Sequence, residues 1–405
     1  MIEYSDARAL VLGAAKALPS ESVPLARALG RTLARDVRAR EDIPPFTKAT
    51  MDGYAVRAAD TRPSGDRTRR EVELEVLADL PAGRLSKAAV GRGQAVRIMT
   101  GAPLPAGADA VVMVEDTESQ ERSVKVRRQV QPGDNIGLAG EDLKKGEIAL
   151  ERGALIGPAE SGMLAAAGVH RVPVTRRPKL AVIATGDEIV EPGEPKGPGQ
   201  IRNSNGTALT AMAVEAGAEA SYLGIARDRK ASLASKLARA GHADILVLSG
   251  GVSVGDYDLV KDGLEASGVK PVFWKVRIKP GKPVFFGVRG RQLVFGLPGN
   301  PTSSMVTFLL FVRPAVDRLL GRAVTGPESA TAVLDETIVL KPGRTQFLRG
   351  SFTSRGPVLK VAPYQDQRSG VLRSMVRSRV LIVVPADASR LEAGREVEIL
   401  LMDGL

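Results

Sequence analysis

Short apolar runs alternate with stretches of helical periodicity between residues 179 and 314. The runs have the length of strands, and the stretches between them repeat apolar residues every three or four positions. The strands expected on this basis cover residues 180–184, 222–225 and 244–249, and the helices cover 203–216, 229–240 and 259–267. This order predicts an α/β domain, a doubly wound parallel sheet with helices on both faces.

The segments on either side of this region have a different pattern. Residues 57–136 and 330–405 both contain short strand-like runs separated by turns rich in glycine and proline, and the later set predicts a small β-barrel or sandwich. Linkers are indicated at residues 176–178 and 321–329. Amphipathic or apolar helices are expected over 5–18, 158–167 and 302–320. The chain is therefore expected to be a multidomain protein of α/β and β parts.

The composition narrows the possible chemistry. The 405 residues include no cysteine and only two histidines, His170 and His242. Disulfides, thiolate metal sites and cysteine nucleophiles are excluded, and a multi-histidine zinc site or a Ser-His-Asp triad is disfavoured. Any metal is expected to be a hard cation with oxygen ligands, most simply Mg²⁺.

The net charge of +11 raises the question of nucleic-acid binding. Basic residues are spread along the chain beside acidic ones, and the few aromatic residues are not interleaved with them. No stacking surface is indicated, so we expect no nucleic-acid partner. No run approaches the ~20 apolar residues that a membrane-spanning helix needs, and we expect no membrane partner and a cytoplasmic protein.

Three loops rich in glycine and proline stand at the ends of expected strands. Gly250–Gly255 follows the strand 244–249, Lys279–Lys282 carries a lysine at each end, and Gly296–Pro301 leads into a helix. Backbone N–H groups in such loops and at helix N-termini bind anions, and lysines add positive charge. None of the loops has the Walker or G-x-G-x-x-G pattern. They predict a site for a phosphorylated ligand beyond the carboxyl ends of the strands.

Carboxylates in the loops are the candidate ligands for Mg²⁺. They are Asp52, Asp142, Asp187, Glu188, Asp228, Asp256 and Asp258. Mg²⁺ usually takes one or two carboxylates together with waters and substrate phosphates. Two simpler interpretations stay open, because Asp52 also suits an Asp-Gly turn and Asp256 with Asp258 also suits a helix cap. The residues alone indicate a metal-assisted reaction on a phosphate anhydride or a similar anion.

Seven motifs occur in a fixed order along nearly the whole chain. They are Ala49–Val56, Arg97–Pro103, Gly140–Asp142, Thr185–Glu188, Ser249–Asp258, Lys279–Lys282 and Gly296–Pro301. Together they resemble the molybdopterin molybdenumtransferases of the MoeA type, which also form the E domain of gephyrin. Each motif alone is a weak signal, whereas all seven in this order are specific.

The resemblance implies an enzyme that inserts molybdate into adenylylated molybdopterin, with Mg²⁺, and releases AMP. It also implies an elongated homodimer whose active site lies between the α/β domain of one subunit and an inserted domain of the other. The molybdopterin adenylyltransferase and molybdoenzyme chaperones are further implied partners. The implied domains are a discontinuous N-terminal domain (1–40 and 137–175), an inserted β-rich domain (41–136), an α/β molybdopterin-binding domain (176–325) and a C-terminal β-barrel (326–405).

Matching motifs also imply roles for single residues. The implied catalytic residues are Asp52, Thr100, Asp142, Glu188, Asp228 and Asp258, of which Asp52, Glu188, Asp228 and Asp258 are the implied metal ligands. The residues implied to bind pterin, phosphate or molybdate are Ser249, Gly250, Gly251, Ser253, Gly255, Lys279, Lys282, Pro298, Asn300, Pro301, Arg349 and Ser369.

Other interpretations stay open beside the transferase. Ser378-Arg379 stands where the family usually has an Ala-Asn pair, close to the C-terminal contacts. A tungstate-inserting paralogue and a non-catalytic pterin-binding scaffold are the alternatives. A molybdopterin adenylyltransferase would resemble only residues 178–320. Retention of the loop carboxylates and of both lysines favours catalysis over a scaffold.

Overall fold

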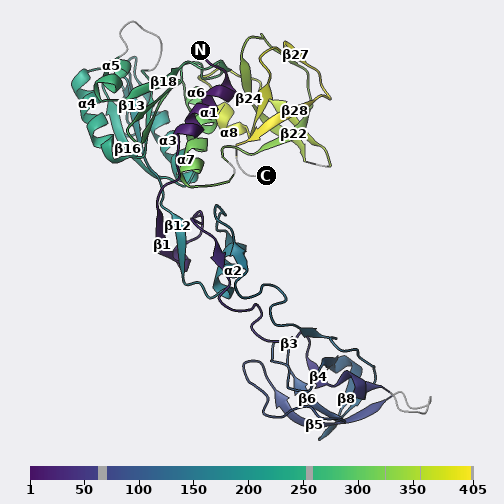
Figure 1. Ribbon diagram of the computed structural model, residues 1–405. Coiled ribbons are helices and arrows are strands. Elements are labelled where there is room, and N and C mark those ends of the chain that lie inside the picture. Colours follow the sequence, from purple (N-terminus) through teal and green to yellow (C-terminus); the bar gives the residue numbers. More distant parts are fainter. Residues whose placement is uncertain (63–70, 252–258, 324, 356, 403–405) are drawn as a thin grey trace.

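The computed structural model describes residues 1–405 except 63–70, 252–258, 324, 356 and 403–405. Figure 1 shows an elongated molecule in which the α/β domain and the C-terminal β-domain lie together at one end, and a β-rich domain lies at the other. A narrow middle part joins the two ends. Among the described residues, no helix has the length and apolar character needed to cross a membrane.

The α/β domain is built on a six-stranded sheet with the order β16-β13-β17-β21-β20-β18. The strands are β13 (Lys179–Thr185), β16 (Glu219–Ala226), β17 (Ile245–Ser249), β18 (Lys270–Trp274), β20 (Phe285–Arg289) and β21 (Gln292–Leu297). The pairs among β16, β13, β17 and β21 are parallel, while β20 and β18 run antiparallel to their neighbours. The prediction of a parallel sheet is therefore wrong for one strand, β20, because β18 runs antiparallel to β20 and thus in the same direction as β21. The connection between Arg289 and Gln292 is a two-residue hairpin, which can join only antiparallel strands.

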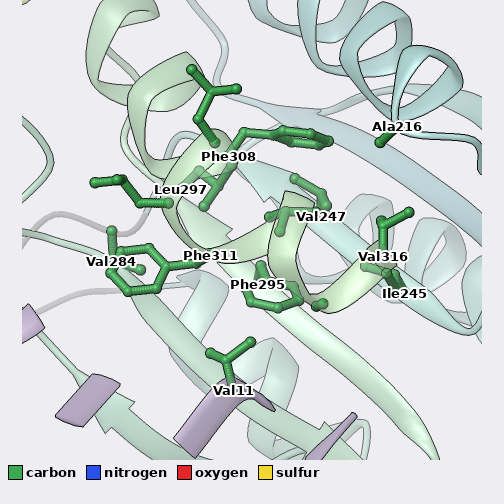
Figure 2. Close-up of a cluster of buried hydrophobic side chains, with 14 of the residues drawn as sticks. Val11, Ala216, Ile245, Val247, Val284, Phe295, Leu297, Phe308, Phe311 and Val316 are labelled. Carbon is green, nitrogen blue, oxygen red and sulfur yellow. The ribbon is translucent and has the colours of Figure 1, made fainter. Parts of the chain in front are cut away.

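Helices cover both faces of this sheet, as predicted. The first face carries α3 (Ser204–Glu215) and the helix that begins at Pro301, and the second carries α4 (Lys230–Arg239) and α5 (Leu259–Ala266). Successive residues of β17 alternate between two apolar cores, with Val247 in the first and Leu248 in the second. Figure 2 shows the first core, where phenylalanines of the sheet and of the long helix pack together.

The long apolar helix predicted over 302–320 is present but irregular. It consists of α6 (Pro301–Thr307), a π-helical turn η5 (Phe308–Val312) and α7 (Arg313–Leu319). Pro314 lacks a backbone N–H, so a regular helix could not keep its hydrogen bond to the carbonyl four residues earlier. The wider π turn directly before Pro314 accommodates that loss.

The C-terminal domain is a closed β-barrel, which settles the choice between barrel and sandwich. Its strands are β22 (Ser329–Leu334), β24 (Thr345–Arg355), β25 (Leu359–Pro363), β26 (Val380–Val384) and β28 (Glu396–Leu401), and pairing between β24 and β26 closes the ring. Shorter elements are β23 (Ile338–Val339), β27 (Arg390–Leu391) and α8 (Arg373–Arg377). Strand β19 (Ile278–Lys279), which belongs to the α/β domain by sequence, pairs with β24. This pairing joins the lysine loop directly to the barrel.

Helix α1 (Tyr4–Ala14) packs between the α/β domain and the barrel. Ala7 and Val11 are buried in the first core, and the Tyr4 ring lies 5.9 Å from the ring of Phe311 and 5.1 Å from that of Phe347. The segment 1–40 is therefore divided in space, because its helix packs away from residues 137–175.

The middle part and the β-rich domain follow. The middle part contains β1 (Ser20–Pro24), η1 (Leu25–Arg27), β2 (Val37–Arg38), β11 (Ile148–Leu150), α2 (Pro158–Ala166) and β12 (Arg171–Thr175). The β-rich domain has a sheet of order β7-β4-β6-β5-β9-β8, formed by β4 (Gly53–Val56), β5 (Val72–Leu80), β6 (Gln94–Ile98), β7 (Ala110–Met113), β8 (Thr117–Ser119) and β9 (Ser123–Val126), with η2 (Ala58–Thr61) and η3 (Val114–Asp116). Strand β3 (Lys48–Ala49) pairs with β10 (Ile136–Gly137), so the chain enters and leaves this domain side by side.

Candidate active site

A pocket of about 670 Å³ opens beyond the carboxyl ends of β13, β17 and β21, where the sequence predicts a ligand site. Seven of the implied site residues are among those that line it: Glu188, Ser249, Gly250, Gly251, Pro298, Asn300 and Pro301. The short strands β14 (Ile189–Val190) and β15 (Ile201–Arg202) and the first residues of α3 form another part of its wall. The α/β fold thus gathers residues that lie more than a hundred positions apart in the sequence.

The turn after β17 requires glycine at two successive positions. Gly250 has φ +95° and Gly251 has φ +68°, a conformation that residues with a Cβ rarely adopt. A Cβ on Gly250 would lie 2.8 Å from the carbonyl oxygen of Thr185, and one on Gly251 would lie 2.5 Å from a methyl group of Val260. The turn therefore keeps its backbone close to β13 and open to the pocket.

The loop after β13 is held by Arg227, which follows β16. Its guanidinium donates to the carbonyl oxygens of Asp187, at 3.2 Å, and of Ile189, at 2.8 Å. The Asp228 backbone N–H donates to the Asp187 carboxylate at 3.2 Å. Glu188 and Asp228 are both exposed, and of the two only Glu188 is among the residues that line the pocket.

Asn205 in the first turn of α3 is a pocket residue that sequence reasoning missed. Its side-chain amide donates to the Ser249 hydroxyl and to the Gly299 carbonyl oxygen, each at 2.8 Å. Asn203 caps the same helix by accepting a hydrogen bond from the Gly206 N–H at 2.9 Å. The Asn-Ser-Asn sequence was a readable capping signal, but nothing in it showed the contacts with the loops after β17 and β21.

The loop after β21 is joined to the barrel through Ser369. Asn300 donates to the Ser369 hydroxyl at 2.9 Å, and the Thr302 hydroxyl donates to the Ser369 carbonyl oxygen at 2.5 Å. Gly370 and Leu372 line the pocket beside them. The structure therefore brings Ser369 into contact with Asn300 and Thr302, while its role in binding molybdate stays a prediction.

Arg349 is fully buried and contacts the segment that carries Ser369. Its guanidinium donates to the Ser374 hydroxyl at 2.8 Å and to the carbonyl oxygens of Asp366 and Arg368 at 3.1 and 3.2 Å. Burial lowers the pKa of the Arg349 guanidinium, and the charge of Asp366 opposes this shift. These contacts place Arg349 behind the Ser369 loop, where it fixes the loop's position.

Lys279, the last residue of β19, and Lys282, on the loop that leads to β20, are both exposed. The described lining of the pocket includes Pro283, next to Lys282, but neither lysine. Pairing of Lys279 with Gln346 of β24 fixes the start of this loop. Lys282 therefore adjoins a residue of the pocket's wall, and the role of both lysines in binding an anion stays a prediction.

Asp52 and Thr100 form a pair in the β-rich domain, at the opposite end of the molecule from the pocket. The Thr100 backbone N–H and hydroxyl both donate to one oxygen of Asp52, at 2.7 and 2.6 Å. Asp52 directly precedes β4, and Figure 1 shows β4 far from β13 and β16. The hydroxyl and then the N–H of Thr100 lower the pKa of the exposed Asp52 carboxyl, so this group is held ionised.

The remaining implied residues lie elsewhere. Asp142 is exposed on the connection between the middle part and the β-rich domain, where its N–H donates to the Ile43 carbonyl oxygen at 3.0 Å. Asp258, Ser253 and Gly255 fall outside the described residues. Among the residues that are described, no three Asp, Glu or His side chains come together in a group that could hold a metal ion. The Mg²⁺ ligand set of Asp52, Glu188, Asp228 and Asp258 stays a prediction.

Comparisons with known proteins agree with this architecture along the whole chain. Residues 2–168 match the MoeA N-terminal region (domain I and II), 181–318 a probable molybdopterin binding domain, and 331–402 the MoeA C-terminal region (domain IV). The molybdopterin molybdenumtransferase of Bacillus subtilis is 37% identical over 388 residues, 95% of this chain and 90% of that protein. Its namesake in Staphylococcus aureus strain Mu50 is 34% identical over 406 residues, 99% of this chain and 96% of that protein.

Solved structures give the same result. The molybdopterin biosynthesis MoeA protein of Pyrococcus horikoshii OT3 has a TM-score of 0.86 and 32% identity, covering 99% of this chain and 100% of that one. The match includes every domain, from the β-rich end to the barrel. The chain belongs to the MoeA family of molybdopterin molybdenumtransferases.

Proposed function

We propose that the chain inserts molybdate into adenylylated molybdopterin and releases AMP in the biosynthesis of the molybdenum cofactor. The observation that carries this proposal is the pocket beyond β13, β17 and β21, whose lining includes seven of the implied site residues. Family membership supports the substrates, because the matched relatives are named molybdopterin molybdenumtransferases. A cytoplasmic enzyme with small-molecule substrates fits this role.

The chain's own groups suit two bound anions. Glycine backbone at 250 and 251 lets a phosphate approach closely, and α3 directs the positive end of its dipole at the pocket. Lys279 and Lys282 supply mobile positive charge, so phosphate and molybdate can lie together although they repel each other in water. Glu188 and Asp228 provide oxygen ligands for Mg²⁺, which when bound would offset the charge that develops as the anhydride breaks.

We infer that a second copy of the chain completes the site. Asp52 and Thr100 lie in the β-rich domain, far from the pocket of their own chain, so this pair cannot act in that pocket. In a two-fold dimer of elongated subunits, the β-rich domain of one copy reaches the pocket of the other. In this dimer the Asp52 carboxylate lies beside Glu188 and Asp228 and joins them in the predicted Mg²⁺ site.

Release of AMP from adenylylated molybdopterin tests the proposal. The assay compares the wild-type chain with and without molybdate and with and without Mg²⁺. We expect AMP release that needs both additions. AMP release that does not depend on molybdate would contradict molybdate insertion. If a folded dimer releases no AMP, even with tungstate supplied, only a role as a pterin-binding scaffold would be left. Binding to the molybdopterin adenylyltransferase or to molybdoenzyme chaperones is a separate expectation, checked by titrating those proteins.

A further inference from the structure

We propose that Asn205 recognises a hydrogen-bond donor on the organic part of the substrate, a hydroxyl or N–H group of its nucleoside or pterin. The inference rests on the proposed function, because it takes the pocket as the substrate site. It assigns a role in substrate specificity to a residue whose contacts in the pocket could not be inferred from the sequence.

The orientation of the Asn205 side chain is determined by its neighbours. A backbone carbonyl oxygen can only accept hydrogen bonds, so the amide nitrogen must be the atom that faces Gly299, at 2.8 Å. The same nitrogen also donates to the Ser249 hydroxyl at 2.8 Å. A flipped amide would place two acceptors against each other. The side-chain oxygen therefore points away from both loops.

This oxygen is buried and, among the described residues, has no hydrogen-bond partner. Asn205 lines the pocket, so this oxygen belongs to a side chain in the pocket's wall. Buried acceptors without partners are rare in folded proteins, and one beside a ligand pocket calls for a donor from the ligand. Asn203, two residues earlier, gives the contrast, since its oxygen accepts from Gly206 and its nitrogen donates to Tyr222.

The chemistry of an amide oxygen selects the kind of ligand group. Phosphate and molybdate present acceptor oxygens, which an amide oxygen repels. The N–H and O–H groups of the substrate belong to its nucleoside and its pterin. Asn205 thus accepts a hydrogen bond from the neutral part of the substrate, while the glycine turn and the lysines bind its anionic groups.

A purely structural role is the competing explanation, because Asn205 also ties the loop after β17 to the loop after β21. A cycle of protein and ligand changes separates the two. Binding is measured by calorimetry for wild type, Asn205→Ala and Asn205→Asp, with Thr210→Ala as a control in the same helix but outside the pocket lining. The ligands are AMP against 2′-deoxy-AMP, 3′-deoxy-AMP and IMP, and pterin against lumazine, which lacks the 2-amino group.

We expect one analogue that lacks a donor to bind wild type and Thr210→Ala about three- to tenfold more weakly than its parent, the effect of one neutral hydrogen bond. Asn205→Ala should bind that analogue and its parent equally, whereas Asn205→Asp, which keeps an acceptor oxygen, should still discriminate. If Asn205→Ala abolishes discrimination within the AMP series, the donor belongs to the nucleoside. If it abolishes discrimination between pterin and lumazine, the donor belongs to the pterin. If wild type and Asn205→Ala lose the same affinity between parent and analogue for every ligand pair, the role of Asn205 is overturned and the proposed function stays intact. Failure of wild type to bind any of the ligands would overturn both.

Discussion

Thr100 donates two hydrogen bonds to a single oxygen of Asp52, one from its hydroxyl at 2.6 Å and one from its backbone N–H at 2.7 Å. Both side chains are exposed, and Asp52 directly precedes β4 of the β-rich domain. Two donors on one carboxylate oxygen favour the charged form and fix its direction. An ionised, oriented carboxylate is what a site for a hard cation requires.

Removing the Thr100 hydroxyl should make Asp52 easier to protonate. The pKa of Asp52 is lowered in the folded protein chiefly by that hydroxyl, so the carboxylate stays charged to a lower pH than an ordinary aspartate. In Thr100→Ala the pKa of Asp52 should rise toward its ordinary value. When the pH is lowered, the variant should therefore lose any step that needs the charged carboxylate at a higher pH than wild type does. An NMR titration of the Asp52 carboxyl measures the shift directly.

The control is Thr117→Ala, which removes a threonine hydroxyl from the same domain that bonds to the Val114 carbonyl oxygen. Its Asp52 titration should match that of wild type. An unchanged titration in Thr100→Ala would show that the hydroxyl does not govern Asp52.

Replacing Gly250 should damage the pocket at its base. An alanine there must adopt φ +95°, and its Cβ would lie 2.8 Å from the Thr185 carbonyl oxygen. The left-handed backbone conformation alone should destabilise the α/β domain of Gly250→Ala by about 1–3 kcal/mol. The close contact with the Thr185 carbonyl oxygen should increase this loss of stability. Urea unfolding followed by the fluorescence of Trp274, the only tryptophan, measures the change in this domain.

Gly241→Ala is the matched control, because nothing lies within 4 Å of its Cβ position and its φ is not in the left-handed region. Its unfolding should be close to that of wild type. Equal stability of Gly250→Ala and Gly241→Ala would contradict the account of the glycine turn.

Arg349 should not tolerate lysine. The guanidinium makes hydrogen bonds to Ser374, Asp366 and Arg368 from inside the protein, and a lysine ammonium cannot reproduce this planar arrangement. We expect Arg349→Lys to lower the stability of the barrel by about 2 kcal/mol, because the buried Ser374 hydroxyl and two partly buried carbonyl oxygens lose their donor. Hydrogen exchange in residues 364–374 gives the local measure, and it should become faster.

Arg390→Lys, which changes an exposed arginine paired with Glu392, should alter stability by less than about 0.5 kcal/mol. Arg349→Lys with the stability and exchange of wild type would show that Arg349 does not hold the Ser369 loop and would favour a direct contact with molybdate.

The local parts of the fold were accessible to sequence reasoning. Apolar runs such as 244–249 are strands, and their order along the chain sufficed to predict the layers and the ligand edge. The reversed direction of β20 was missed because a continuous apolar pattern does not reveal the two-residue hairpin after Arg289. The split of residues 1–40 was missed for a similar reason, since the partners of Tyr4 are Phe311 and Phe347, far along the chain.

The site shows the same division. The glycine- and proline-rich composition of the loops was enough to predict that Gly250, Gly251 and the turn at Pro298 belong to the ligand site. Asn205 gave no such signal, because its partners Ser249 and Gly299 are 44 and 94 positions away and meet it only in the folded sheet. Arg349 carries a motif match, but its burial behind the Ser369 loop depends on the closure of the barrel.

The central claim is that the pocket of one subunit and the Asp52–Thr100 pair of another make one active site. Mixing two inactive variants, Asp52→Ala and Glu188→Ala, tests it most directly. Each mixed dimer would hold one intact site, so an equal mixture with free subunit exchange should recover about a quarter of the wild-type rate of AMP release. A mixture that exchanges subunits, as shown by mass spectrometry, and yet stays as inactive as its parents would contradict the shared site.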